Sequence, residues 1–503
     1  MGQIQDGGAW SIQKIHFWND DWTMRPWTFP VALQTEPGSP REPVFQQIAQ
    51  AIRGDIRRGR LRPGDPLPGS RTLAQTLGVH RNTVLAAYRE LEAEGWTDTG
   101  RRTTRVAGDL PEAPAMRART GAGPGYALEA AAATPLRPAP EGLDFGGGLP
   151  DLRLVPTDLL ARAYRRALGS RALLGYGDPR GEPRLRSALA RLLSEMRGLA
   201  ASQDRLMVTG GSQGALDLAA RTLLRPGDRV AVEDPGYPTA WATLRAAGAA
   251  LVPVPVDEGG LRVEALAPIL REGPLRAIYL TPHHQFPTTV TMSAPRRMAL
   301  LDLARRHRIA VLEDDYDNEF HFEGRPVLPL AGDDPGGVVV YLGTLSKILA
   351  PGLRIGFVAG PRPLVEALAA RRGTADGQGD LILQRAAAEL LEDGLLQRHA
   401  RKMRRTYLAR RDALAEALRR HLGDAVAFDP PPGGMSLWVR VDPSLDLEAW
   451  VARAAKAGVG VYPGRRFDFS DRPRPNLRLG FSSLDETELE AAVRRLARAL
   501  PRG

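Results

Sequence analysis

From about residue 205 the chain alternates short apolar runs with segments of helical length, and this alternation constrains the fold more than any other feature. The pattern predicts a mostly parallel sheet with helices on both faces, because parallel strands need a crossover between them. The predicted strands are residues 205–209, 229–233, 250–254, 276–280, 309–313 and 338–343. Long helices rich in Arg, Ala and Leu follow after about residue 361 and lead to a final α+β segment.

The composition is that of a soluble protein with more than one domain. A chain of 503 residues is too long for one ordinary core, and 43% of its residues are hydrophobic and 25% charged. No apolar run reaches the roughly 18 residues of a membrane span, and no signal peptide opens the sequence, so we expect a cytoplasmic location without membrane contact. The absence of cysteine excludes disulfides, thiolate catalysis and zinc–thiolate sites, and no metal site is predicted.

Three short helices and a pair of strands are predicted between residues 42 and 107. Apolar residues recur at helical spacing from Val44, and the sequence GRLRPGDPLPG then ends that helix. Ser70 is a good N-cap for a second helix, Gly78 makes a turn, and a third helix begins near His80. The segment WTDTGRRTTRVAG is typical of two short strands joined by a basic loop.

The start of the third predicted helix, HRNT at residues 80–83, carries side chains that can read DNA. In a helix-turn-helix this end of the second helix enters the major groove, where arginine can bond guanine, asparagine adenine, and threonine a phosphate or a thymine methyl. Residues 41–107 carry 12 arginines against seven acidic residues, which is half of the net charge of +10. This charge suits binding to double-stranded DNA, although a helical hairpin solvated by arginines has a similar pattern. The expected DNA contacts are Ser70, Arg71, His80, Arg81, Asn82, Thr83, Arg101 and Arg102.

The string GRLRPGDPLPGSRTLAQTLGVHRNTVLAAYRELEAEG resembles the winged helix-turn-helix of GntR-superfamily regulators over its whole length. The resemblance implies binding to DNA rather than a solvated hairpin. The wing departs from that family, because GRRTT stands at residues 100–104 where a Gly-Ser-Gly-Thr type of sequence is usual. We therefore rest the predicted DNA contacts mainly on the recognition helix.

Lysine is rare in this chain, and one lysine stands inside a distinctive motif. The protein has 64 arginines but only Lys14, Lys347, Lys402 and Lys456. A chain so biased towards arginine that keeps Lys347 in YLGTLSKILAPGLRIGFV is expected to need an amine there. Two further motifs are TGGSQGALDLAARTLL and VLEDDYDNEF, and the acidic residues of the second emerge at the carboxyl end of a predicted strand, where open α/β sheets bind ligands.

These motifs resemble those of fold-type I pyridoxal 5′-phosphate (PLP) aminotransferases from about residue 142 to the C-terminus. Together with the N-terminal pattern, they make the chain similar to the MocR-type (GabR-like) regulators of the GntR superfamily. The resemblance implies an α/β fold with a mostly parallel large domain and an α+β small domain. The expected parts are an unassigned extension (1–35), the winged helix-turn-helix domain (36–107), a Pro/Ala/Gly-rich linker (108–141), the large domain (142–360) and the small domain (361–503).

The resemblance implies roles for the residues near the cofactor ring. Lys347 would form a Schiff base with the PLP aldehyde, which a guanidinium cannot do. Asp314 matches the carboxylate that keeps the pyridine nitrogen protonated, with Asp315 as its rival, and Tyr316 matches a contact of the ring hydroxyl. The segment LTPHHQFPTTV departs from the family at Thr289, where glycine is usual.

The resemblance also implies contacts around the rest of the cofactor. Tyr237 matches the residue stacked on the ring, and either His284 or Gln285 is expected to meet the ring hydroxyl. Tyr176 matches a residue that reaches the cofactor phosphate of the partner subunit, which implies a homodimer, and Arg478 matches the residue that binds the carboxylate of an amino-acid ligand. The phosphate in the same subunit is expected to contact Gly211, Ser212, Gln213, Thr344, Ser346 and Arg354.

Three functions are compatible with this combination of domains. In the first, the chain is a PLP-binding transcriptional regulator in which the cofactor on Lys347, and an amino acid joined to it, control DNA binding. In the second, it is an aminotransferase with an appended DNA-binding module, and in the third a DNA-binding protein with a degenerate, cofactor-free core. We favour the regulator, because a metabolic aminotransferase has no need of the N-terminal domain and because the motif around Lys347 is intact.

Overall fold

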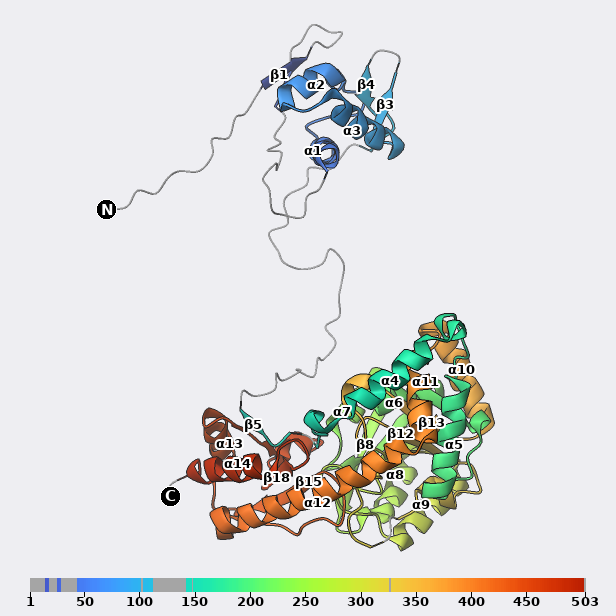
Figure 1. Ribbon diagram of the computed structural model, residues 1–503, viewed down its shortest axis with the longest axis vertical. Coiled ribbons are helices and arrows are strands. Elements are labelled where there is room, and N and C mark those ends of the chain that lie inside the picture. Colours follow the sequence, from blue (N-terminus) through green and yellow to red (C-terminus); the bar gives the residue numbers. More distant parts are fainter. Residues whose placement is uncertain are drawn as a thin grey trace, which may run out of the picture. The chain divides into compact units, whose positions relative to one another are not determined.

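The chain forms two compact units, residues 1–131 and 132–503, each of which has its own hydrophobic core in the computed structural model (Figure 1). Two short antiparallel strands, β1 (Lys14–Phe17) and β2 (Arg25–Thr28), are also present in the first unit. No helix in the described part of the chain is both long and apolar enough to cross a membrane. Besides the two strands, the structure describes residues 43–100, 103–111, 142–146, 148–324 and 327–501.

Several features predicted from the sequence lie largely or wholly outside the described residues. They are most of the N-terminal extension (1–35), most of the linker (108–141), and the wing residues Arg101 and Arg102. These features therefore stay predictions.

Within residues 43–111, the N-terminal unit contains three helices and an antiparallel pair of strands. The elements are α1 (Val44–Arg57), α2 (Ser70–Leu77), α3 (Arg81–Ala93), β3 (Thr97–Thr99) and β4 (Thr104–Val106). Their apolar faces enclose one core, which includes Ile48, Ile52, Leu73, Val84, Tyr88, Leu91 and Val106. The arrangement is the one that the helical spacing and the strand pattern predict.

The start of α2 differs from the prediction in one detail. Gly69, and not Ser70, occupies the N-cap position, and no side chain caps this helix. Ser70 is instead the first helical residue, and its Oγ accepts a hydrogen bond from Nε of Arg81 at 3.2 Å. Ser70 therefore connects the start of α2 to the start of α3. Gly78 makes the predicted turn with a φ of 64°, a left-handed conformation that glycine adopts without strain.

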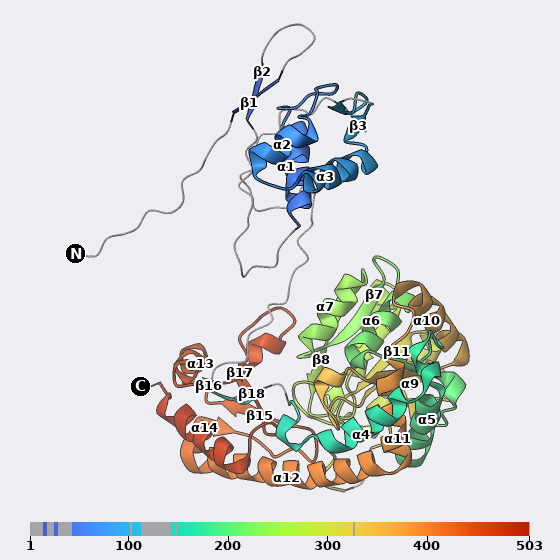
Figure 2. The ribbon, with the colours of Figure 1, turned by 45° about the horizontal axis from the view of Figure 1, so that its top comes forward.

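An eight-stranded sheet forms the centre of the C-terminal unit (Figure 2). Its strands are β6 (Leu206–Thr209), β7 (Arg229–Asp234), β8 (Ala250–Asp257), β9 (Gly260–Leu261), β10 (Ala277–Leu280), β11 (Ala310–Asp315), β12 (Val339–Thr344) and β13 (Gly356–Ala359). They lie in the order β6-β13-β12-β11-β10-β7-β8-β9. The pairs from β12 to β8 are parallel, whereas β13 is antiparallel to both of its neighbours and β9 is antiparallel to β8. The six predicted strands are all present.

Helices cover both faces of this sheet, as predicted. One face carries α6 (Gly211–Leu223), α7 (Pro238–Ala246) and α10 (Arg362–Ala375). The other carries α4 (Thr157–Leu168), α5 (Pro183–Arg197), α8 (Leu266–Glu272), α9 (Ala294–His307) and α11 (Leu381–Glu392). Side chains of a strand point alternately to the two faces, and both faces are covered by helices, so the strands are apolar throughout. In β12, Val340 and Leu342 pack on the first face, and Val339 and Tyr341 pack on the second.

The rest of the unit is an α+β part built on a second, four-stranded antiparallel sheet. Its strands lie in the order β14 (Val426–Ala427), β15 (Ser436–Val441), β18 (Asn476–Gly480) and β17 (Tyr462–Pro463). The helices α12 (Leu395–Leu422), α13 (Leu447–Lys456) and α14 (Glu486–Arg498) supply apolar residues to its core. β5 (Leu143–Asp144) pairs with β16 (Val459–Gly460) in this part, while α10 and α11 pack on the large sheet. The division at residue 360 stays a prediction.

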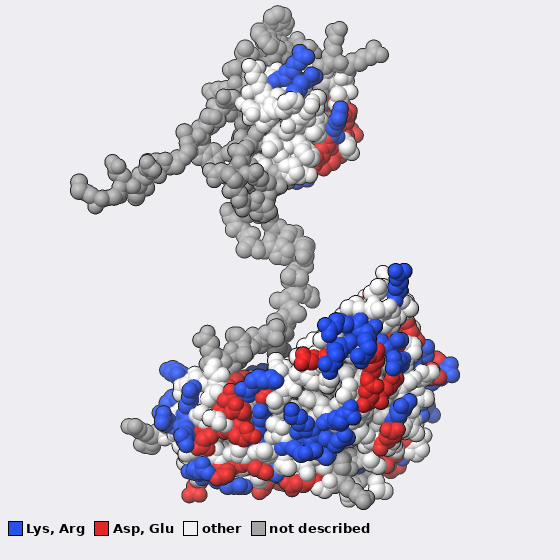
Figure 3. All heavy atoms as spheres, viewed as in Figure 1, with Lys and Arg blue, Asp and Glu red and all other residues white. Residues whose placement is uncertain are grey.

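Arginine and acidic side chains are interspersed on the face of the C-terminal unit seen in Figure 3. Some of them join separate elements: Arg166 on α4 contacts Glu389 on α11 at 2.9 Å. A single exposed pair of this kind contributes about 0–1 kcal/mol, so the apolar cores remain the main source of stability.

Candidate cofactor site and DNA-binding surface

A cavity of about 360 Å³ lies at the carboxyl ends of the parallel strands β11 and β12. Ligands bind at this edge of an open α/β sheet, where loops rather than further strands follow. Ten residues predicted from the sequence line the cavity: Ser212, Gln213, Tyr237, Asp314, Tyr316, Thr344, Ser346, Lys347, Arg354 and Arg478. The fold thus brings together side chains that are up to 266 positions apart in the chain.

Lys347 follows the end of β12 and is part of the cavity wall. Its Nζ donates a hydrogen bond to the backbone oxygen of Gly148 at 2.9 Å. Burial, together with the positive charge of Arg478, lowers the pKa of Lys347 to about 8. A larger share of this amine is therefore neutral and nucleophilic near pH 7 than in an exposed lysine.

Asp314 and Asp315, the rivals for the ring nitrogen, have different surroundings. Tyr279 donates its hydroxyl hydrogen to Oδ2 of Asp314 at 2.8 Å, and Oδ1 of Asp314 has no partner in the described part of the chain. Burial raises the pKa of Asp314 to about 7. Asp315 does not line the cavity and accepts a hydrogen bond from the Tyr341 hydroxyl at 2.6 Å. Burial opposes ionisation of Asp315, but Arg197, the Tyr341 hydroxyl and neighbouring histidines together outweigh it and lower that pKa.

The N-terminus of α6 and Arg354 form a cradle for an anion. Gly211 begins this helix with a φ of 82°, and no side chain of the described residues caps the helix. A Cβ on Gly211 would lie 2.8 Å from the Arg354 guanidinium, so glycine is what lets that group approach. Arg354 donates to the backbone oxygen of Gly210 at 2.9 Å, and the buried Oγ of Ser346 has no partner among the described residues. Free backbone N–H groups, a guanidinium and a hydroxyl are donors suited to a phosphate.

Local contacts hold two further walls of the cavity. Thr344 donates to the backbone oxygen of Ile355 at 3.2 Å and accepts from the backbone N–H of Ser346 at 3.1 Å, which shapes the turn before Lys347. The ring of Tyr237 packs against Phe286 with centroids 4.8 Å apart. Gln213 also lines the cavity, but its amide donates to the hydroxyl of Thr243.

Neither His284 nor Gln285, the two candidates for the ring hydroxyl, lines the cavity. The His284 ring pairs with Asp317, and the Gln285 amide donates to backbone oxygens of its surroundings. Thr281 and Phe286 of the same segment line the cavity instead. The choice between His284 and Gln285 stays open.

Thr289 stands in the left-handed region with a φ of 65°, at the place where the family usually has glycine. A residue with a Cβ pays about 1–2 kcal/mol in this conformation. Its hydroxyl donates to the backbone oxygen of Thr288 at 2.6 Å. The departure from the family thus leaves the turn intact but adds local strain.

Arg478 enters the cavity from β18 and is only 2% exposed. Its guanidinium lies 4.2 Å from the ring centroid of Phe286, and its Nε has no hydrogen-bond partner in the described part of the chain. Burial lowers the pKa of Arg478, and the hydroxyl of Tyr316 opposes that shift. An arginine held in this way can form two parallel bonds with a carboxylate.

The sequence did not single out some residues that support the site. Tyr279 donates a hydrogen bond to Asp314, and the ring of Phe286 contacts both Tyr237 and Arg478. Glu233 accepts from the hydroxyl of Thr281 at 2.8 Å, and burial raises the pKa of Glu233 to about 8. Tyr279 and Glu233 lie inside predicted strands, where a polar side chain among apolar neighbours can be recognised from the sequence as unusual. Phe286 cannot be recognised in this way, because aromatic residues are common in any core.

The residues predicted to contact DNA lie at the start of α3 and next to it. Arg71, His80, Arg81 and Asn82 are exposed, and Ser70 and Thr83 are half-buried. His80 is the N-cap of α3, since its Nδ1 accepts from the backbone N–H of Asn82 at 3.2 Å. This nitrogen is therefore engaged within the helix. The exposed side chains of Arg81 and Asn82 present the donors that base recognition requires.

The residues of the cavity fit PLP. Three buried polar atoms on its walls have no partner in the described residues: Asp314 Oδ1, Ser346 Oγ and Arg478 Nε. Asp314 Oδ1 suits a ring nitrogen, Ser346 Oγ suits a phosphate, and Arg478 Nε suits the carboxylate of a ligand. Lys347 supplies the amine that would react with an aldehyde. Buried polar atoms normally have partners, so this set indicates a polar ligand.

The fold and this cavity define the class of the C-terminal unit, which is an aminotransferase-like domain with the fold of PLP-dependent enzymes. A family model for aminotransferases of class I and II matches residues 142–496, and a model for bacterial regulatory proteins of the gntR family matches residues 45–104. A kynurenine aminotransferase from Pyrococcus horikoshii is 34% identical in sequence and superposes with a TM-score of 0.67. The superposition covers 71% of this chain and 90% of that one.

Two regulatory proteins match over nearly the whole chain. The probable rhizopine catabolism regulatory protein MocR of Rhizobium meliloti is 34% identical over 91% of this chain and 94% of its own length. The HTH-type transcriptional regulator TauR of Rhodobacter capsulatus is 34% identical over 90% of this chain and 96% of its own length. The chain therefore belongs to the MocR-type transcriptional regulators of the GntR superfamily, as the motifs predict.

Proposed function

We propose that this regulator binds PLP covalently on Lys347 and that the cofactor, with an amino acid joined to it, controls how a homodimer binds DNA. The observation that carries the proposal is the cavity around Lys347. Its walls hold three buried polar atoms that have no partner among the described residues, in a chain that also has an exposed recognition helix. A DNA-binding protein with a degenerate core would not need these buried polar groups, because each costs free energy when it is unpaired.

Bound PLP supplies an electrophilic carbon and a ring that accepts electrons. Lys347 offers the amine, and its lowered pKa leaves part of it neutral near pH 7. Asp314 would hold a proton at the ring nitrogen. Its Oδ1 has no partner in the described part of the chain, and Tyr279 donates to its other oxygen. Arg354 and the N-terminus of α6 would hold the phosphate.

An amino-acid effector is proposed on the basis of Arg478. This guanidinium faces the same cavity as Lys347 and is buried, so that a carboxylate beside it would be held with little competition from water. An amino acid brings both a carboxylate for Arg478 and an amine that can exchange with that of Lys347. This pairing of groups favours an amino acid over a simple carboxylic acid.

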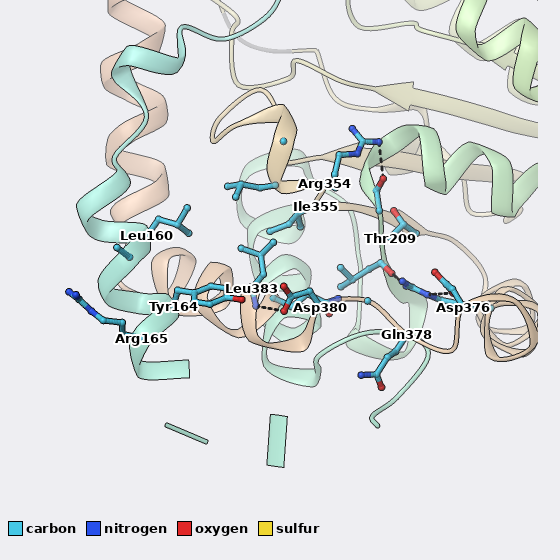
Figure 4. A pocket seen from close by; sticks show the side chains of 18 of the residues that line it. Leu160, Tyr164, Arg165, Thr209, Arg354, Ile355, Asp376, Gln378, Asp380 and Leu383 are labelled. Carbon is cyan, nitrogen blue, oxygen red and sulfur yellow. Dashed lines mark hydrogen bonds and ion pairs between the residues drawn. The ribbon is translucent and has the colours of Figure 1, made fainter. Parts of the chain in front are cut away.

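A homodimer is proposed because apolar surface and a second cavity lie beside the cofactor cavity. Of the large apolar side chains exposed in the described residues, five of eight lie between residues 149 and 176: Leu149, Leu152, Leu168, Leu174 and Tyr176. A cavity of about 830 Å³ is lined by α4, by residues 376–384 and by Arg354 (Figure 4). Tyr176 is fully exposed and does not line the cofactor cavity of its own chain. A partner subunit that covers this surface would bring its own Tyr176 to the phosphate end of the site.

The ligand acts on DNA binding only if it binds two arrangements of the protein with different affinity. The test is a footprint of the purified protein on the DNA upstream of its own gene, with and without PLP. We expect a protected site whose occupancy or extent changes with PLP. Protection that ignores PLP would contradict control by the cofactor and direct attention to a second ligand.

An aminotransferase with an appended DNA-binding module is the second candidate. The observation in its favour is that Lys347, Asp314 and Arg478 lie together as a complete set for PLP chemistry. Sustained turnover of an amino acid and a keto acid by the purified protein, together with no footprint, would favour this candidate over the regulator.

A further inference from the structure

Three buried histidines come together beside the cofactor cavity. His283 and His284 follow β10, and His321 follows β11. Their exposures are 3%, 1% and 8%, and one ring nitrogen of each lies within 4.8 Å of those of the other two. The described part of the chain contains no other comparable group of histidine and acidic residues.

Four of the six ring nitrogens in this cluster have no protein partner among the described residues. Both ring nitrogens of His283, Nε2 of His284 and Nδ1 of His321 make no hydrogen bond within the described residues. Buried ring nitrogens are normally satisfied by a hydrogen bond or by a metal ion. Apolar packing alone therefore explains the positions of the three rings poorly.

His284 also has the outer partner that metal-binding histidines commonly have. Its Nδ1 lies 2.7 Å from Oδ1 of Asp317, which is 1% exposed. A carboxylate there holds the proton on Nδ1 and leaves the lone pair on Nε2. Gly433 lies against this nitrogen: a Cβ at position 433 would be 2.3 Å from Nε2 of His284. Glycine therefore keeps the approach to the nitrogen open.

We propose that His283, His284 and His321 form a binding site for a divalent transition-metal ion of the zinc class. Three imidazole ligands suit Zn²⁺, Ni²⁺ or Cu²⁺, whereas Mg²⁺ and Ca²⁺ prefer oxygen ligands. Three histidines leave one position of a tetrahedral zinc site for water.

The three rings must move closer together to bind an ion. Zinc–nitrogen bonds are about 2.0–2.1 Å long, so two nitrogens of a tetrahedral site lie about 3.4 Å apart. The separations of up to 4.8 Å must therefore shrink by about 1.4 Å, which rotation of the imidazole rings can supply. A bound ion would tie the segment after β10 to the segment after β11. Since the backbone oxygen of His284 also accepts from the Tyr316 hydroxyl at 3.1 Å, the ion would brace one wall of the cofactor cavity.

The test is calorimetric titration of Zn²⁺ into the full-length protein after treatment with a chelator, with and without PLP. We expect one high-affinity site per chain under both conditions, because none of the three ligands lines the cofactor cavity. The variants His283→Gln and His321→Gln should each bind at least about 100-fold more weakly, and Asp317→Asn about 10- to 100-fold more weakly. His307→Gln, which removes an exposed histidine at the end of α9, is the matched control and should bind like the wild type.

X-ray absorption of the zinc-loaded wild type keeps the proposal testable if the variants do not fold. Scattering from three imidazoles would support the site, and scattering from one imidazole or none would overturn it. The absence of a high-affinity site, or undiminished affinity in both folded ligand variants, would also overturn it. None of these results depends on PLP binding, so failure here is separate from failure of the proposed regulatory function.

Discussion

At the scale of single residues, adjacent side chains of like type have separate tasks because a strand points them in opposite directions. Asp314 lines the cofactor cavity, whereas Asp315 lies on the other side of β11 with Tyr341 and Arg197. The sequence alone left these two acids as rivals. Burial raises the pKa of Asp314, whereas at Asp315 the effect of burial is outweighed by Arg197 and other neighbours, which lower the pKa.

The pKa of Lys347 predicts how covalent attachment of PLP depends on pH. The neutral amine reacts, so the rate of attachment to the apoprotein should rise about tenfold per pH unit at low pH and level off near pH 8. An ordinary lysine would show a rise that continues to about pH 10.5. Cofactor absorbance after rapid mixing measures this rate, and a midpoint above pH 10 would contradict the lowered pKa.

At the scale of elements, the junction of α6 and β13 depends on two glycines. Gly211 has a positive φ and faces Arg354, and a Cβ on Gly356 would lie 2.4 Å from the backbone of Gly211. Because β13 has only four residues and begins with this glycine, its sequence carries little of the apolar pattern of a strand. The sequence therefore predicted the cradle by resemblance but missed the strand that packs against it.

Gly211→Ala should weaken PLP binding at least about tenfold, since the added methyl displaces the Arg354 guanidinium and a charge-assisted hydrogen bond is worth about 1.5–3 kcal/mol. Equilibrium titration with PLP measures the effect. Gly214→Ala on the same helix is the control, because a Cβ there meets nothing within 4 Å and its φ is not positive. Equal affinity for PLP in the two variants would show that Gly211 is not needed for the anion cradle.

The recognition helix leads to a second prediction at this scale. Arg81→Ala should weaken binding to the footprinted site by about 10- to 100-fold, because a bidentate base contact is worth about 1–3 kcal/mol, and should weaken binding to random DNA far less. Fluorescence anisotropy with both DNAs measures the difference. Arg89→Ala changes another exposed arginine of α3 and is the control. An equal loss on both DNAs would make Arg81 a phosphate contact.

At the scale of the whole molecule, the chain joins two units with separate cores, so cofactor binding and DNA contact should be separable. Lys347→Ala should abolish covalent PLP and its effect on the footprint, while DNA binding itself remains within about tenfold of the wild type. Lys402→Ala removes an exposed lysine of α12 and is the matched control. Loss of all DNA binding in a folded Lys347→Ala protein would show that the two units are not independent.

The sequence by itself determined the family, the order of the parts and ten of the residues that line the cofactor cavity. It could do so because strand periodicity, helix caps and motifs such as TLSK at residues 344–347 are local properties of the chain. The tertiary structure decided which of two adjacent acids faces the cavity, which residues support Asp314, and that His321 meets His283 and His284. These features depend on side chains distant in sequence that meet only when the strand ends converge at one edge of the sheet, and no local pattern encodes that meeting.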